Sequence, residues 1–138
     1  MDPRLILAAL VSLGAHPDED SLPRAAAIER ACVEGRVARC AVLHALAFAE
    51  SGYRLRHRRA PLMGCNPYTR DDVQQARCAA RAWNAALRLC RTQARALVRY
   101  QLGQCAVPRG RRFRGARSLA TRYVAAVLRV AERIERQP

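Results

Sequence analysis

Glu50 is the residue with the clearest capacity for acid–base chemistry. It lies near the end of the most apolar stretch of the chain, VARCAVLHALAFAES, and no other acid occurs between Glu34 and Asp71. Partial burial of a carboxyl group favours its protonated form. Such an acid can protonate the leaving oxygen of a glycosidic bond as the bond breaks. The alternative is a structural Glu at a helix end, neutralised by Arg54 or Arg56.

Six cysteines in a chain of 138 residues predict a disulfide framework, with buried free thiols as the alternative. The predicted helix ends favour a pair between Cys90 and Cys105 and allow one between Cys32 and Cys40. Disulfides imply an extracytoplasmic location (periplasmic or secreted), or a place in a virion. No CxxC pair occurs, and we expect no histidine to cluster with the cysteines, so neither a metal site nor a cofactor is predicted. The six candidates are Cys32, Cys40, Cys65, Cys78, Cys90 and Cys105.

The charge of the chain points to polyanionic partners. Its 25 basic residues are all arginine, and with 11 acidic residues they give a net charge of +14. Nucleic acid, anionic lipid and anionic cell wall all suit this balance, while a hydrophobic content of 51% argues against disorder. Five arginines in one short segment suit contacts with nucleic-acid phosphates, although a solvated loop is the simpler interpretation and no recognition-helix motif accompanies them. They are Arg109, Arg111, Arg112, Arg114 and Arg117.

The elements that must position these residues are predicted to be helices. Apolar residues recur at helical spacing, and no stretch reads as a convincing strand. Gly35, Gly52 and Gly103 are the expected helix ends, and Thr69 is the expected N-cap of a helix with Asp71 in its first turn. The fold class is therefore an all-α domain of about six helices. Beyond the N-terminal segment, helices are expected over residues 24–33, 37–51, 69–90, 93–102 and 118–136.

Residues 1–22 form a separate segment in this prediction, with the main domain over residues 23–138. The apolar run from Leu5 to Leu13 is too short to span a bilayer. It reads either as the apolar region of a secretory signal or as an amphipathic helix packed on the domain. The stretch HPDEDSLP (residues 16–23) is expected to be a turn or linker.

Four short motifs resemble those of soluble-lytic-transglycosylase-like (SLT) domains, which belong to the lysozyme-like superfamily. ALAFAESGY is similar to the Glu-Ser motif at the end of an apolar helix, and PLMGCNP to the Gly-Leu-Met-Gln segment with its later Pro. YQLG resembles the Tyr-Asn pair followed by Gly. Tyr123-Val124 resembles the Tyr that opens the last helix. The resemblance covers residues 24–136 and implies a single helical domain of the goose-type lysozyme and SLT kind.

The resemblance implies a lytic transglycosylase that cleaves peptidoglycan between N-acetylmuramic acid (MurNAc) and N-acetylglucosamine (GlcNAc). Glu50 would act first as the acid and then as the base, without metal or cofactor. A single carboxylate suffices because the N-acetyl or 6-hydroxyl group of the substrate replaces a second one, and the product carries a 1,6-anhydro end. The glycan strand is the expected partner of a monomeric enzyme. Substrate contacts are implied at Ser51, Met63, Tyr100, Gln101 and Tyr123.

The chain departs from the family pattern at three positions. Gly64 replaces the Gln of the second motif, Pro61 replaces its Gly, and Gln101 replaces the Asn of the third. One polar substrate contact is therefore missing. This departure keeps open a lysozyme-fold protein that binds glycan without cleaving it. An Arg-rich helical module that binds nucleic acid is a separate alternative, which rests on the basic segment of residues 109–117.

A hydrolytic lysozyme (muramidase) on the same fold is a further alternative. Asp71 or Asp72 could supply the second carboxylate, although helix capping already accounts for both. Tyr53, Tyr68 and Trp83 are candidates for stacking on sugars, and a mid-helix Trp such as Trp83 more often belongs to the core.

Overall fold

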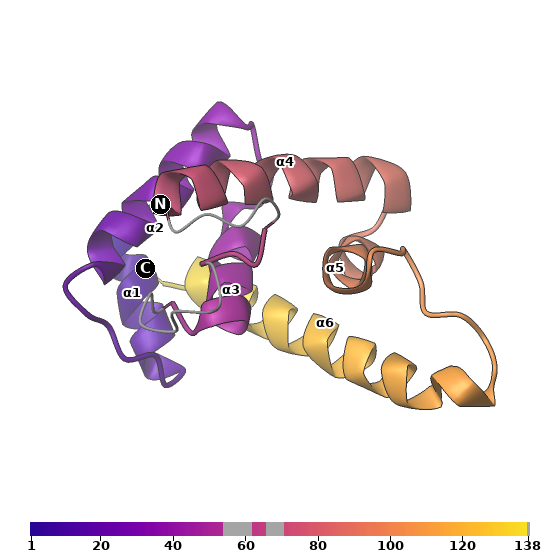
Figure 1. The fold of residues 1–138 in the computed structure, drawn as a ribbon. Helices are drawn as coiled ribbons and strands as arrows, with labels where there is room; N and C mark the ends of the chain where they lie inside the picture. The colour runs from indigo at the N-terminus through magenta and orange to yellow at the C-terminus, as the bar shows by residue number, and fades with distance from the viewer. Residues whose placement is uncertain (54–61, 66–70, 138) are drawn as a thin grey trace.

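The protein is all-α in the computed structural model, which describes residues 1–53, 62–65 and 71–137 (Figure 1). These residues contain six α-helices, one short 3-10 helix and no strand. The prediction of an all-α domain with about six helices is confirmed. The elements are α1 (Pro3–Ser12), α2 (Ser21–Glu34), α3 (Cys40–Ser51), α4 (Asp72–Cys90), α5 (Gln93–Leu102), η1 (Arg111–Phe113) and α6 (Arg114–Glu135).

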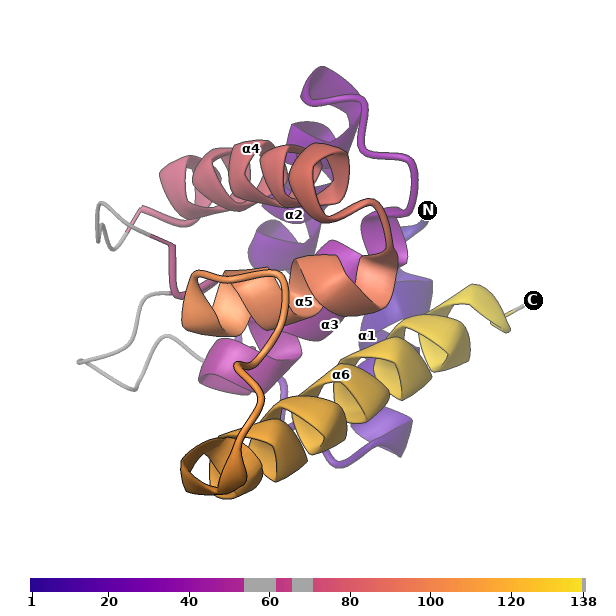
Figure 2. The ribbon, with the colours of Figure 1, turned by 90° about the vertical axis from the view of Figure 1, so that its right-hand side faces the viewer.

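Helix α3 forms the centre of the fold because it is apolar on nearly every side. All residues from Ala41 to Ala47 are buried. The helix packs against α2, α4 and α6. In Figures 1 and 2, α4 lies on one side of α3, and α6 crosses on the other. A helix buried in this way holds the residues at its C-terminal end in a fixed place, and Glu50 is one of them.

The observed helix ends correct some of the predicted ones. Asp71 is the N-cap of α4, because its side chain accepts hydrogen bonds from the backbone N–H groups of Val73 and Gln74. Thr69, the expected N-cap, lies outside the described residues. Helix α3 begins at Cys40 instead of residue 37, since Val37 donates its N–H to Cys32 in a turn that follows α2. The predicted ends at Gly35, Gly52 and Gly103 are confirmed.

Three disulfides join elements that are close in sequence. Cys32–Cys40 links α2 to the start of α3, Cys90–Cys105 links α4 to the segment after α5, and Cys65–Cys78 ties residues 62–65 to α4. The predicted framework and both pairings favoured or allowed by the sequence are confirmed. Three disulfides are typical of proteins that mature in an oxidising, extracytoplasmic compartment.

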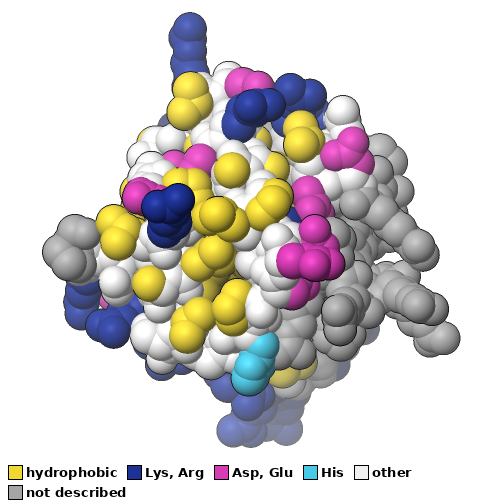
Figure 3. Space-filling model, turned by 90° about the vertical axis from the view of Figure 1, so that its left-hand side faces the viewer, with side chains coloured by type: hydrophobic (Ala, Val, Ile, Leu, Met, Phe, Trp, Pro, Cys, Tyr) yellow, Lys and Arg dark blue, Asp and Glu magenta, His cyan; other side chains and the backbone are white. Residues whose placement is uncertain are grey.

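The apolar N-terminal run is a helix, α1, which packs on the rest of the domain. Ile6, Ala9 and Leu10 are fully buried and belong to the common core, and α1 contacts α2 and α6. Its opposite face leaves Leu5 and Val11 exposed. Figure 3 views this side of the molecule and shows apolar and acidic side chains gathered on it. None of the helices in the described ranges combines the length and apolar character needed to cross a bilayer.

Candidate functional site

Glu50 lies in the last turn of α3 with its carboxylate held between two other parts of the chain. Its side chain is partly buried, and the hydroxyl of Tyr123 on α6 donates a hydrogen bond of 3.0 Å to Oε1. Within the described ranges, no arginine or histidine forms an ion pair with Glu50. Arg54 and Arg56, the partners of the structural alternative, lie outside the described residues. The carboxylate therefore has a neutral donor as its described partner.

Tyr123 contacts the Glu50 carboxylate, and Tyr100 lies near enough for the charge of Glu50 to act on its phenol. Burial raises the pKa of Tyr123 far above its usual range, and the negative charge and hydrogen bond of Glu50 raise it further. Burial and the charge of Glu50 also raise the pKa of Tyr100. Both phenols therefore keep their protons at every physiological pH. The structure thus brings together the three residues that the first, third and fourth motifs singled out.

Gly64 closes the other side of the carboxylate. A Cβ atom at this position would lie 2.8 Å from Oε2 of Glu50 and 3.1 Å from its Cδ. The backbone φ of Gly64 is also +62°, a conformation that residues with side chains adopt at a cost. Any residue with a side chain at position 64 would therefore carry backbone strain and displace the Glu50 carboxylate, and glycine avoids both.

Residues 62–65 are held in place by a side chain that the sequence analysis missed. Gln75 is fully buried in α4, and its Oε1 accepts hydrogen bonds from the N–H groups of Met63 (3.4 Å) and Cys65 (3.1 Å). Its Nε2 donates to the carbonyl of Cys65 at 3.0 Å. The Tyr100 hydroxyl adds a 2.7 Å hydrogen bond to the carbonyl of Met63. A single Gln in an amphipathic helix gives no local signal of such a role, so only the tertiary structure reveals it.

Two predicted substrate contacts point inward instead. Ser51 is 5% exposed, and its Oγ lies 2.9 Å from the carbonyls of both Ala47 and Leu62. Met63 is fully buried in the core. Neither side chain can touch a sugar in this structure, so the predictions of a substrate contact at Ser51 and of a cleft-lining Met63 are corrected. Both residues instead fix the segment that carries Gly64.

The remaining aromatic and amide candidates divide between core and surface. Tyr53 is 3% exposed and Trp83 fully buried, so stacking on a sugar is excluded for both, and the core role of Trp83 is confirmed. Gln101 is exposed at the end of α5, and no hydrogen bond between described residues joins it to Glu50. Tyr68 lies outside the described residues.

The two acids proposed as a second carboxylate have structural partners. Asp71 caps α4. Asp72 Oδ2 accepts a 3.2 Å hydrogen bond from Arg24, whose guanidinium is buried and also contacts Asp18 and the carbonyl of Tyr53. Burial raises the pKa of Asp72, and the Arg24 charge opposes that shift. Asp72 therefore serves to neutralise a buried arginine.

A second cluster of reactive side chains lies where α2 meets α3. His44 Nε2 is 2.7 Å from Glu29 Oε1, which is also 3.2 Å from the sulfur of Cys40. The expectation that no histidine lies near the cysteines is wrong for His44. A signal was present, because residues 40 and 44 are four apart and lie on one helix face. The other ring nitrogen of His44, Nδ1, lies 2.7 Å from the Tyr53 hydroxyl.

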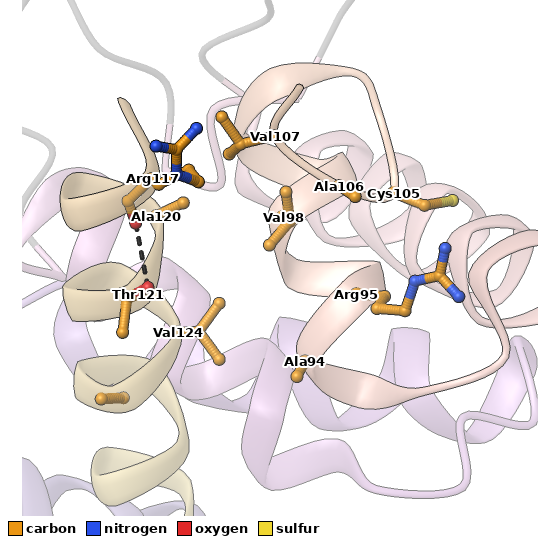
Figure 4. Close-up of a pocket in the computed structure, with 11 residues that line it drawn as sticks. Ala94, Arg95, Val98, Cys105, Ala106, Val107, Arg117, Ala120, Thr121 and Val124 are labelled. Atoms are coloured by element: carbon orange, nitrogen blue, oxygen red, sulfur yellow. Dashed lines mark hydrogen bonds between the residues drawn. The ribbon is translucent and has the colours of Figure 1, made fainter. Parts of the chain in front are cut away.

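An apolar pocket of about 510 Å³ lies between α5 and α6. Figure 4 shows that Val98 of α5 and Val124 of α6 point into the space between the two helices. Glu50 does not line this pocket, although the neighbouring residues Tyr100 and Tyr123 belong to the same two helices. The pocket thus provides an apolar surface on the same two helices that carry Tyr100 and Tyr123.

The basic segment before α6 is partly occupied by contacts within the chain. Arg117 donates hydrogen bonds to the carbonyls of Pro108 and Gly110, and the guanidinium of Arg112 lies 4.6 Å from the ring centre of Phe113. The side chains of Arg109, Arg111 and Arg114 are exposed. These three remain accessible to an anionic polymer.

Comparison of the chain with protein-family models, with curated proteins and with solved structures gives no significant match.

Proposed function

We propose that the protein cleaves peptidoglycan glycan strands between MurNAc and GlcNAc, as a lytic transglycosylase with a lysozyme-like helical fold. The observation that carries the proposal is the setting of Glu50: a partly buried carboxyl group that receives a hydrogen bond from Tyr123 and lies so near Gly64 that a side chain there would collide with it. The motif resemblance independently selects Glu50 and Tyr123, whereas Gly64 departs from the family motif.

In the proposed reaction, Glu50 donates its proton to the glycosidic oxygen as the bond from that oxygen to C1 of MurNAc breaks. The N-acetyl group of the substrate stabilises the positive charge that develops at C1. The Glu50 carboxylate then accepts the proton of the 6-hydroxyl group, whose oxygen bonds to C1. This step closes the 1,6-anhydro ring and returns the proton to Glu50, so no water is consumed.

The neighbours of Glu50 support both halves of this cycle. The Tyr123 hydroxyl donates to Oε1 and orients the carboxyl group, while glycine at position 64 leaves room for Oε2. The pairing of Asp72 with Arg24 and the capping role of Asp71 favour a reaction with one carboxylate over hydrolysis with two. The net charge of +14 would concentrate the enzyme on anionic wall polymers, and added salt would weaken this effect.

The direct test is loss of turbidity of purified peptidoglycan sacculi. Wild-type protein should clear the suspension, and Glu50→Gln, which keeps the size of the side chain and removes its proton transfer, should lower the rate by about 100-fold or more. Equal clearing by both proteins would refute the role of Glu50. Binding to sacculi without release of muropeptides would identify instead a lysozyme-fold protein that binds glycan only.

A further inference from the structure

We propose that the α2–α3 corner becomes a zinc site when its disulfide is reduced, with Cys32, Cys40, His44 and Glu29 as the four ligands. This inference goes beyond the proposed function and does not depend on Glu50. It concerns a cluster on the opposite end of α3 from the glycan site, as the positions of residues 40 and 44 in that helix show.

The cluster places donor atoms of the kinds that zinc binds close together. The candidate ligand atoms of Glu29, Cys40 and His44 all lie within 4.8 Å of one another. Cys32 is bonded to Cys40, so its sulfur belongs to the same cluster. Ligand atoms around tetrahedral zinc are about 3.3–3.8 Å apart. After reduction, rotation of the two cysteine side chains would move the sulfurs apart toward this spacing, and zinc would replace the 2.7 Å hydrogen bond between His44 Nε2 and Glu29 Oε1.

The helices present these four residues as two pairs. Glu29 and Cys32 are three residues apart on α2, and Cys40 and His44 are four apart on α3, so each pair occupies one helix face. Two thiolates, an imidazole and a carboxylate are ligands that Zn²⁺ prefers. Both helices are fixed by the core, so little rearrangement is needed to assemble the site.

The surroundings supply what a metal-binding histidine requires. His44 is fully buried, and Cys32 is 5% exposed. With zinc on Nε2, the Nδ1–H of His44 would donate to the Tyr53 hydroxyl, which already lies 2.7 Å away. A hydrogen bond of this kind fixes the ring orientation of a ligating histidine. Tyr53 is therefore a positioning residue for the metal.

The conversion balances with a dithiol as the reductant. Two electrons and two protons pass from the dithiol to the Cys32–Cys40 disulfide, giving two thiols, and the dithiol becomes a disulfide. Zinc binding then releases both thiol protons to the solvent as the sulfurs become thiolates. The corner would thus be joined by zinc in a reducing compartment and by the disulfide in an oxidising one.

The first experiment titrates full-length protein, reduced with a water-soluble phosphine, with Co²⁺ as a spectroscopic probe. One equivalent should give thiolate-to-cobalt charge-transfer absorption and intense tetrahedral d–d bands, which Zn²⁺ should abolish. The double variant Cys32→Ser/Cys40→Ser should lose these bands. The matched variant Cys90→Ser/Cys105→Ser, which also lacks one disulfide, should retain them.

The second experiment locates the protected thiols, whether or not reduction loosens the fold. Alkylation of the reduced protein with and without Zn²⁺, followed by peptide mass spectrometry, should show protection of Cys32 and Cys40 alone. Tyr53→Phe should weaken zinc binding by about 10- to 100-fold, a change that loss of a purely structural contact would not produce. Absence of cobalt bands, their persistence in Cys32→Ser/Cys40→Ser, or protection of other cysteines would overturn the proposal.

Discussion

Replacement of Gly64 by alanine should distinguish the effect of the position of Glu50 on activity from the effect of lower fold stability. The new Cβ would lie 2.8 Å from Oε2 of Glu50, so the carboxylate must retreat by about 0.6 Å to reach 3.4 Å, the near limit of ordinary contact. The carboxylate is the end of a flexible side chain, so its retreat costs little stability. It does disturb the 3.0 Å hydrogen bond from Tyr123. Because misplacement by about 1 Å can cost about 100-fold in rate, we expect a fall of about 10- to 100-fold in kcat/KM on sacculi.

Gly52→Ala provides the matched control for this prediction. Gly52 has a φ of +63°, almost equal to the +62° of Gly64, but no atom lies within 4 Å of a Cβ built there. Both variants should lose about 1 kcal/mol of unfolding free energy through backbone strain. Thermal unfolding should show similar shifts of about 3–5 °C for the two proteins. Equal activity of the two variants would refute the claim that Gly64 positions Glu50.

Three further changes test other parts of the site. Tyr123→Phe removes a hydrogen bond to a charged group, worth about 1.5–3 kcal/mol, and should lower kcat/KM by about tenfold or more, with a fall in Tm from the same lost bond. Loss of the Cys65–Cys78 disulfide in the double alanine variant should cost about 3 kcal/mol of stability, and also activity, because Gly64 is no longer held. His44→Gln should remove a decline in Tm that begins as the pH falls below 6.5, the usual pKa of histidine.

The sign of the His44 effect follows from its environment. Burial lowers its pKa in the folded protein and outweighs the Glu29 carboxylate, which raises it. As the pH falls, the His44 side chain therefore binds a proton in the unfolded chain before it does so in the folded protein. The contribution of neutral His44 to the free energy of unfolding is complete above pH 6.5 and is lost progressively below it. His16, an exposed histidine, supplies the control, since His16→Gln should leave the decline unchanged. A pH profile of His44→Gln identical to that of the wild type would contradict this explanation.

The controls for the other two predictions use the same chain. The Cys90–Cys105 disulfide spans 15 residues, and Cys65–Cys78 spans 13. Loss of Cys90–Cys105 should therefore cost similar stability, but it should not lower activity. Equal activity losses in the two disulfide variants would show that stability alone sets the rate. For Tyr123→Phe, an unchanged kcat/KM would show that the hydrogen bond to Glu50 has no part in the reaction.

Local sequence signals predicted most of the helical framework. Helix α5 was predicted with its observed limits, 93–102, because Gly103 ends it and apolar residues repeat at helical spacing. The limits of α4 and α6 were less accurate. Asp71 and Thr69 are both good capping residues, and only the observed hydrogen bonds to Asp71 distinguish them. Helix α6 extends back to Arg114, because Gly115 does not interrupt it.

The motifs predicted which residues gather around Glu50. They did not predict the orientation of side chains that depends on tertiary packing. Glu50, Tyr100 and Tyr123 come together as the motifs imply. The inward orientation of Ser51 and the clamp formed by Gln75 depend on backbone groups of residues 62–65, which are distant in sequence. The spacing of apolar residues along the sequence carries no information about such long-range hydrogen-bond partners.

The most direct test of the central claim is mass spectrometry of the muropeptides released from purified sacculi. We expect 1,6-anhydro-MurNAc ends from the wild-type protein and a release by Glu50→Gln that is slower by about 100-fold or more. Reducing MurNAc ends, which are heavier by one water, would show hydrolysis and contradict the proposed closure of the anhydro ring. Release of the same products by Glu50→Gln at the wild-type rate would contradict the assignment of Glu50 as the catalytic acid and base.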